Sequence, residues 1–379
     1  MSRWNILLLL VLLLLVVAGC SSSLEVFERG NVHLENGELD LAISDYDLAI
    51  EQDPELAVAY NNRGFAYGKK GETNLALLDF DQAIKLDPDN PTAYSNRGDV
   101  YGNIDELELA ISSYDQAIEL DPEMALAYNG RANAYFDTGK LDLAFSDYDQ
   151  AIKHDPEFSV AYNHRGFAYA AIGEISLAIS DYDQALALDP DYAGAYNNRG
   201  FAYAENGRLD LAIADYDQAI ELDPGAAHAF NNRGVAHSLS GSLDLALFDF
   251  DKSVTLDPGA ASTFFNRGGA HLENGDLDLA ISDFDQAIEL DPSLGRAYHN
   301  RGYAYSSKGE LDSAIADYNQ SIELDPSYAV AYFNRGIAYS GNGENDLAIS
   351  DFRKALELSD DPMFREFVEE ELKSLGIDP

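Results

Sequence analysis

The side chains that could do chemistry in this chain of 379 residues recur at regular intervals. An asparagine stands directly before an arginine in seven places. A carboxamide presents a donor and an acceptor side by side, which is the complement of a peptide group. This chemistry would hold an extended peptide by its backbone, without regard to the peptide's side chains. The predicted peptide-binding asparagines are Asn62, Asn96, Asn198, Asn232, Asn266, Asn300 and Asn334.

The sequence predicts no catalytic, metal or cofactor site. Seven histidines are present, but none has the His-Glu-x-x-His or paired-His spacing of a zinc site. Asp-Tyr-Asp or Asp-Phe-Asp recurs in most repeats and could suggest a metal-binding pair. Its placement on the same predicted helix each time favours a structural, solvated role. We therefore expect no enzymatic activity, no cofactor and no metal.

The elements that position these residues repeat every 34 residues, as the arginines from Arg29 to Arg335 show. Each unit has two apolar stripes at helical spacing, with a glycine such as Gly71 between them and usually a proline at the end. This pattern predicts ten pairs of antiparallel helices. The predicted units span 23–56, 57–90, 91–124, 125–158, 159–192, 193–226, 227–260, 261–294, 295–328 and 329–362.

The unit resembles the tetratricopeptide repeat, whose signature places aromatic residues, Gly, Ala and Pro at fixed offsets. With Tyr60 as the fourth position, the matching residues are Gly64, Tyr67, Ala76, Phe80, Ala83 and Pro88. The departures include Ala132 in place of the glycine, and His33, His237 and His271 in place of the second tyrosine, where we expect packed rings. The resemblance implies an all-α superhelical solenoid of helix-turn-helix repeats, with residues 363–379 as a C-terminal capping helix and tail. Asp40 and Asn74, near the starts of second helices, are expected to cap free amides.

Arginine at the seventh position is unusual, because the family that the unit resembles has a large apolar residue there. A guanidinium beside the core needs a partner. If the hairpin turns near its glycine, an aspartate of the second helix lies level with the arginine in nine of ten units, Ser113 being the exception. We therefore predict a structural ladder of ion pairs. Its members include Arg63 with Asp79, Arg199 with Asp215, and Arg233 with Asp249.

The sixth-position asparagines look like the asparagine ladder in the repeat region of O-linked N-acetylglucosamine transferase. That resemblance implies a concave surface on which they hold an extended peptide, while the variable ninth position reads its side chains. The predicted apolar anchors at the ninth position are Phe65, Phe167, Phe201 and Tyr303. The alternative is inheritance, because units that arose by duplication would keep an ancestral asparagine that has no function.

The first residues differ in kind from the rest. Ile6 to Val17 is an unbroken apolar run, which suits the core of a signal peptide better than a full membrane span. Val17-Ala18-Gly19-Cys20 resembles the bacterial lipobox, whose cysteine is lipidated and becomes the N-terminus. We expect a signal peptide over 1–19, a lipidated tether over 20–22, and anchoring to the outer membrane or, without one, to the outer face of the cytoplasmic membrane. The alternative is an uncleaved N-terminal membrane helix.

The acidic balance limits the partners. The formal charge is −43, which repels phosphate backbones and argues against nucleic acid. The only cysteine is Cys20, so no intrachain disulfide is expected. We expect a membrane-anchored scaffold that binds proteins or extended peptides, some of them basic, and supports assembly of an envelope complex. The alternative is an acidic structural surface protein that depends on cations and has no dedicated peptide ligand.

Overall fold

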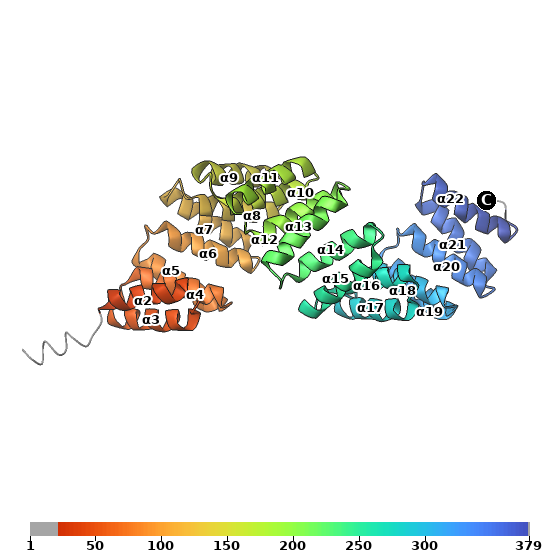
Figure 1. Ribbon diagram of the computed structural model, residues 1–379, viewed down its shortest axis with the longest axis horizontal. Coiled ribbons are helices and arrows are strands. Elements are labelled where there is room, and N and C mark those ends of the chain that lie inside the picture. Colours follow the sequence, from red (N-terminus) through yellow and green to blue (C-terminus); the bar gives the residue numbers. More distant parts are fainter. Residues whose placement is uncertain (1–21, 378–379) are drawn as a thin grey trace, which may run out of the picture. The chain divides into compact units, whose positions relative to one another are not determined.

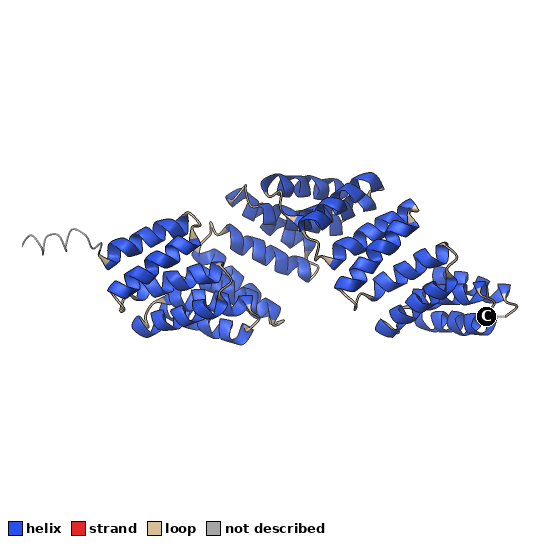
Figure 2. Cartoon of the chain, turned by 90° about the horizontal axis from the view of Figure 1, so that it is seen from below, coloured by secondary structure: helices blue, strands red, loops and turns tan. Residues whose placement is uncertain are grey.

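The structure is a computed structural model that describes residues 22–377. All regular secondary structure within these residues is α-helical, arranged as successive antiparallel helix pairs (Figures 1 and 2). The prediction of an all-α helix-turn-helix solenoid is confirmed. The predicted signal peptide, 1–19, and Cys20 lie outside the described residues. The contacts divide the chain after Leu188 into an N-terminal and a C-terminal unit.

The N-terminal unit contains five helix pairs. The first helices of its pairs are α2 (Ser23–Glu35), α4 (Ala57–Lys69), α6 (Pro91–Asn103), α8 (Ala125–Asp137) and α10 (Ser159–Ala171). The second helices are α3 (Leu39–Gln52), α5 (Thr73–Leu86), α7 (Leu107–Leu120), α9 (Leu141–His154) and α11 (Ile175–Leu188).

The C-terminal unit contains five further pairs and a final helix. Its first helices are α12 (Ala193–Glu205), α14 (Ala227–Leu239), α16 (Ala261–Asn274), α18 (Gly295–Ser307) and α20 (Ala329–Gly341). Its second helices are α13 (Leu209–Leu222), α15 (Leu243–Leu256), α17 (Leu277–Leu290), α19 (Leu311–Leu324) and α21 (Asn345–Leu358), and α22 (Pro362–Ser374) follows them.

Small residues let the two helices of a repeat pack closely. A Cβ atom added at Gly64 would lie 3.0 Å from the Phe80 ring and 3.1 Å from the Ala76 carbonyl oxygen. Ala76 and Ala83 are fully buried on the facing helix. The recurring spacing of Gly, Ala and aromatic residues therefore has a steric cause, because a bulky side chain at the glycine would push the hairpin apart, and the fourth repeat has only the small Ala132 there.

The turn between the two helices of a repeat requires a left-handed residue. Gly71 has φ of 77°, and glycine takes this place in nine of the ten described hairpins. The third repeat places Asp105 there instead, with φ of 61°. A residue with a Cβ atom is strained in this conformation, although aspartate tolerates it better than most.

The expected capping by Asp40 and Asn74 is wrong. The N-caps of α3 and α5 are Glu38 and Glu72, and neither makes a side-chain cap hydrogen bond. Asp40 lies in the first turn of α3, where its charge complements the helix dipole. Aspartate instead orders the turns between repeats, since Asp53 accepts a hydrogen bond from the Glu55 amide at 3.1 Å.

Helix α22 covers the last repeat. Its side chains Val368 and Leu372 are buried against Phe352 and Ala355 of α21. Asp361 caps the helix by accepting a hydrogen bond from the Met363 amide at 3.1 Å. The apolar stripe of the last second helix is thereby shielded from water. Across residues 22–377, none of the helices combines the length and the apolar character that a membrane span requires.

Candidate functional site

The first helices lie on the inner side of each unit. Successive first helices contact one another, as α4 and α6 do in the N-terminal unit and α14 and α16 do in the C-terminal unit. No comparable contact joins successive second helices within the described part of either unit. Because the spacing between repeats is smallest along the first helices, any groove along a unit forms on that side.

The four predicted aromatic anchors lie on these first helices and are exposed. The exposed fractions are 37% for Phe65 on α4, 53% for Phe167 on α10, 49% for Phe201 on α12 and 48% for Tyr303 on α18. Aromatic side chains exposed to this extent add little to the core. They offer apolar area and a preferred stacking geometry to a ligand.

A cavity of about 610 Å³ lies on the inner side of the N-terminal unit, and we call it the N-terminal groove. It is lined by residues of α4, α6, α8 and α10, including the predicted site residues Phe65 and Asn96. Asp99, Asn133 and His164 add polar groups. The volume and the mixed lining are typical of a binding cavity. The other predicted anchors and asparagines do not line this groove.

The sixth-position asparagines make hydrogen bonds between repeats. Asn96 Nδ2 donates to Asn61 Oδ1 of the preceding repeat at 3.1 Å, and Asn61 Nδ2 donates to Asn62 Oδ1 at 3.0 Å. Asn232 and Asn266 donate in the same way to Asn197 and Asn231, both at 3.0 Å. These bonds use one N–H of each carboxamide, which leaves a second N–H and further acceptor capacity. Contact of these asparagines with a peptide stays a prediction.

The fifth-position residues are part of this network, and sequence reasoning missed them. Asn61, Asn129 and Asn197 are buried, and their partners are the sixth-position groups of the same or the next repeat. A buried carboxamide requires hydrogen-bond partners. The sequence did contain a signal for this network. Polar residues recur at the fifth position, where other repeats have Phe27 and Phe333.

Two histidines replace asparagines in the same network. His299 accepts a hydrogen bond from Asn334 Nδ2 at Nε2, at 2.9 Å, and its Nδ1 lies 3.1 Å from Asn300 Oδ1. This arrangement requires a neutral ring that carries its proton on Nδ1. Burial lowers the pKa of both His164 and His299, which favours the neutral form.

The seventh-position arginines each meet a carboxylate of their own repeat, with one exception. Arg63 donates from Nε to Asp79 at 2.8 Å and from Nη2 at 2.7 Å. The structure brings together the other predicted pairs at similar distances, namely Arg199 with Asp215 and Arg233 with Asp249. The guanidinium groups of the second to tenth repeats also lie near an aromatic face, as Arg63 does at 5.5 Å from the Tyr60 ring centroid.

A second aspartate joins most of these arginines to the preceding repeat, whereas Arg335 contacts Asn319 there instead. Arg233 Nη1 donates to Asp217 at 2.6 Å, and Arg131 Nη1 donates to Asp115 at 2.6 Å. The two carboxylates of the recurring Asp-Tyr-Asp therefore serve two different arginines, one within the repeat and one in the next. The hydrogen bond to Asp317 raises the pKa of Arg301, so the guanidinium of this pair stays charged.

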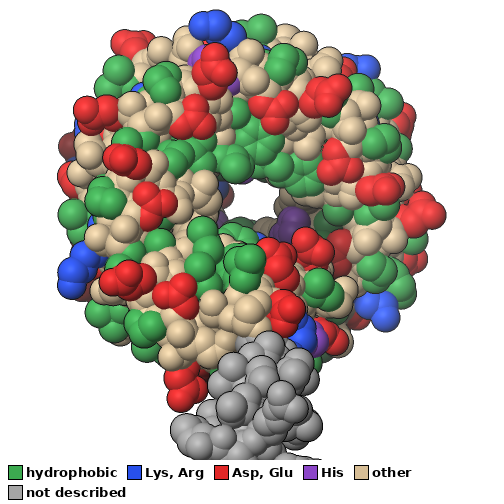
Figure 3. Space-filling model, turned by 90° about the vertical axis from the view of Figure 1, so that its left-hand side faces the viewer, with side chains coloured by type: hydrophobic (Ala, Val, Ile, Leu, Met, Phe, Trp, Pro, Cys, Tyr) green, Lys and Arg blue, Asp and Glu red, His purple; other side chains and the backbone are tan. Residues whose placement is uncertain are grey.

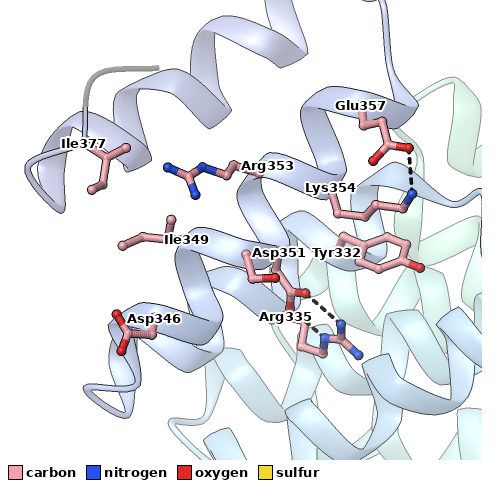
Figure 4. A pocket seen from close by; sticks show the side chains of 10 residues that line it. Tyr332, Arg335, Asp346, Ile349, Asp351, Arg353, Lys354, Glu357 and Ile377 are labelled. Carbon is pink, nitrogen blue, oxygen red and sulfur yellow. Dashed lines mark hydrogen bonds and ion pairs between the residues drawn. The ribbon is translucent and has the colours of Figure 1, made fainter.

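The ladder ends in a surface hollow beside α20 and α21 (Figure 4). Figure 4 shows Arg335 facing Asp351, with Nε at 2.7 Å from Oδ2, and Lys354 paired with Glu357 at 2.9 Å. Arg335 and Lys354 thus already have partners, while Arg353 and Asp346 also line the hollow.

The rest of the surface is acidic. Figure 3 shows Asp and Glu side chains spread over the visible surface, with few Lys and Arg between them. Within residues 22–377, no group of three or more His, Cys, Asp or Glu side chains is arranged to hold a metal ion. Many of the aspartates instead contact arginines of the ladder.

The comparison with protein families identifies the fold. The model described as TPR repeat matches residues 30–71, 69–105, 104–139, 168–207, 270–309 and 302–343, which is more than half of the chain. This chain belongs to the tetratricopeptide repeat (TPR) family. The model described as tetratricopeptide repeat also matches residues 125–158, 193–225 and 329–362. A search of curated proteins finds no match.

Solved TPR structures resemble this chain. A chain of the APC/C hetero-tetramer Cut9–Hcn1 is 18% identical, with a TM-score of 0.58 over 92% of this chain and 76% of that chain. PilF of Pseudomonas aeruginosa is 19% identical, with a TM-score of 0.51 over 56% of this chain and 97% of PilF. MamA is 30% identical, with a TM-score of 0.40 over 46% of this chain and 96% of MamA. At such low identity the first two likenesses concern the fold alone.

Proposed function

We propose that this TPR protein is a membrane-anchored scaffold that binds extended segments of other proteins along the first helices of its repeats. The observation that carries the proposal is the N-terminal groove, where exposed Phe65 lies beside the polar side chains of α6 and α8. An extended segment needs apolar pockets for alternate side chains and hydrogen-bonding groups for its backbone. Asn96 and Asn133 supply carboxamides in the same cavity.

The membrane anchor is a separate part of the proposal. Cys20 follows Val17-Ala18-Gly19 and would carry the lipid, so that Ser22 and the repeats begin directly after the anchor. Such an anchor would hold the scaffold at the cell envelope, where it would bind or assemble a complex. Metabolic labelling of bacterial cells with an alkyne fatty acid tests this part. The wild-type chain should take up the label and Cys20→Ala should not, and equal labelling of both would overturn it.

The groove is tested by comparing two sets of surface substitutions. The groove variant carries Phe65→Asn, in the N-terminal groove, and Phe167→Asn, at the predicted anchor of α10 outside the cavity lining, because asparagine occupies this ninth position in other repeats. The control variant carries Leu75→Ser and Leu177→Ser, two leucines of second helices that are 43% and 47% exposed. Serine occupies the position of these leucines in the ninth repeat, as Ser313. Both variants thus remove exposed apolar area in ways that the repeat tolerates.

Full-length protein in detergent would first be used to select binders from a displayed random peptide library. Synthetic copies of the selected peptides would then be titrated against both variants. We expect the groove variant to bind about tenfold more weakly, in line with loss of an aromatic anchor, and the control to bind like the wild type. Equal loss in both variants, or no selected peptide, would overturn the proposal.

A further inference from the structure

The third and fourth repeats depart from the common residue pattern at the N-terminal groove. Asp99 is the one acidic residue at the ninth position, where other repeats have asparagine, glycine or an apolar side chain. Gly130, in the next repeat, is the one sixth-position residue without a side chain. Both residues line the groove, on the adjacent first helices α6 and α8. Two departures that meet at one cavity indicate a specialised site.

Tyr114 links the two departures. A Cβ atom added at Gly130 would lie 2.5 Å from Cζ of Tyr114, so the ring occupies the space that a sixth-position side chain would fill. The phenol donates a hydrogen bond to Asp99 Oδ1 at 2.7 Å. In the first and fourth repeats, the equivalent tyrosine donates to a neutral asparagine instead, at 2.9 Å to Asn31 and 2.7 Å to Asn133.

The Asp99 carboxylate has capacity left for a ligand. Among residues 22–377, Tyr114 is its only hydrogen-bond donor, and the residue is exposed to the groove. Desolvation by the surrounding protein raises the pKa of Asp99, and the Tyr114 hydrogen bond opposes this effect. A carboxylate that has lost part of its hydration gains more from a nearby cation than one in open water does.

The remaining lining favours a cation on an apolar stem. Asp137 adds a second carboxylate, and Lys69 on α4 is the only ammonium among the lining residues. Lys69 Nζ lies over the Phe65 ring at 5.3 Å from its centroid, and its charge acts to lower the pKa of Asp99 without an ion pair between the two among residues 22–377. The groove therefore carries a net negative charge beside an apolar wall that includes Leu126.

We propose that the N-terminal groove binds a lysine or arginine side chain of an extended protein segment, with Asp99 as the acceptor of its charge. The methylene groups of this side chain would pack against Phe65 and Leu126, and its charged end would reach the Asp99 carboxylate. Lysine and arginine side chains combine a long apolar stem with a terminal donor in this way. The inference rests on the proposed binding of extended segments and specifies one residue of such a segment.

The test uses full-length protein in detergent and four pools of labelled, end-blocked nonapeptides. The central residue of a pool is Lys, Arg, Ala or Glu, and the other positions are mixtures of Ala, Ser, Val, Leu and Phe. Asp99→Asn removes the charge and keeps an acceptor for Tyr114, as Asn133 does for Tyr148. Glu108→Gln removes an exposed charge from α7 of the same repeat and serves as the matched control. Lys69→Ala removes the competing cation.

Fluorescence polarisation should show the Lys and Arg pools binding about tenfold more tightly than the Ala pool. Asp99→Asn should abolish that preference, Glu108→Gln should keep it, and Lys69→Ala should increase it. Equal binding of all pools, or a preference that survives Asp99→Asn, would overturn this inference and leave the proposed binding of extended segments standing. If none of the pools binds, both proposals are overturned.

Discussion

Arg97 Nε lies 3.3 Å from the hydroxyl of Ser113, where the equivalent arginines of the other nine repeats each contact an aspartate. Arg97 keeps its contact with the preceding repeat, because its Nη1 donates to Asp81 at 2.8 Å. The third repeat therefore has half of the usual carboxylate contacts around its guanidinium. The ladder is weakest beside the N-terminal groove, in the repeat that also carries Asp99.

Restoring the missing carboxylate should stabilise the third repeat. We expect Ser113→Asp to raise the free energy of unfolding by about 1 kcal/mol, because a partly buried guanidinium gains a charged acceptor. Urea denaturation followed by circular dichroism measures the change. A lower midpoint would show that desolvation of the new carboxylate outweighs the ion pair.

The two aspartates that share one arginine should differ in their contributions. Asp249 and Asp217 both contact Arg233, but their side chains are 2% and 58% exposed. We expect Asp249→Ala to lower the free energy of unfolding by about 3 kcal/mol, since it leaves a partly buried guanidinium without its inner partner. Asp217→Ala should cost less than about 1 kcal/mol, because water screens an exposed pair. Equal losses in urea denaturation would contradict this ranking.

Glycine should be more stable than Asp105 in the turn of the third repeat. Asp105 has φ of 61°, and it raises the pKa of Asp137 as a secondary cause after burial. We expect Asp105→Gly to raise the free energy of unfolding by about 1 kcal/mol, because glycine adopts this conformation without steric cost. Asp105→Asn separates the effect of charge from that of conformation. If both variants stabilise equally, repulsion between carboxylates rather than strain is the cause.

The two histidines of the amide network should make stability depend on pH. Their pKa values are lowered by burial, so the unfolded chain binds more protons than the folded chain does below about pH 7. The stability that these histidines contribute is therefore present above about pH 6.5, which is the pKa of a histidine in the unfolded chain. It is lost as the pH falls through this value toward the lower pKa of the folded state. Each neutral histidine should account for a loss of roughly 1 kcal/mol between about pH 7.5 and about pH 5.5.

The matched variant for this prediction carries His164→Asn and His299→Asn, because asparagine occupies both positions in other repeats. Its urea midpoint should fall less than that of the wild type on acidification. His228→Asn, which removes an exposed imidazole, is the control for the substitution itself. A double variant with the same pH dependence as the wild type would show that neither histidine resists protonation.

The fold could be predicted from the sequence because nearly all repeats share one pattern of small and aromatic residues, from which few positions, such as Ala132, depart. The 34-residue period, the glycine opposite an aromatic residue and the alanines of the facing helix all act within one hairpin. The position of Arg63 opposite Asp79 also follows from the geometry of a single hairpin. Local rules therefore suffice for the fold and for the contacts inside a repeat.

Contacts between repeats could not be predicted in the same way. The hydrogen bond from Asn96 to Asn61 joins residues 35 positions apart, and its existence depends on how adjacent repeats stack. The role of Asp47, which contacts Arg63 of the next repeat, depends on the same stacking. The capping expectation for Asn74 was wrong because it took the second residue of the helix for the cap. Helix boundaries are uncertain by about two residues in such reasoning.

The central claim, that extended segments bind along the first helices, is tested most directly by locating a bound peptide. A library-selected peptide that carries benzoylphenylalanine would be photo-crosslinked to the full-length protein, and the attachment sites would be found by tandem mass spectrometry. We expect crosslinks to groove residues of α4, α6, α8 and α10, such as Phe65 and Leu126. Crosslinks confined to second helices, at exposed residues such as Leu75 or Leu177, would contradict it.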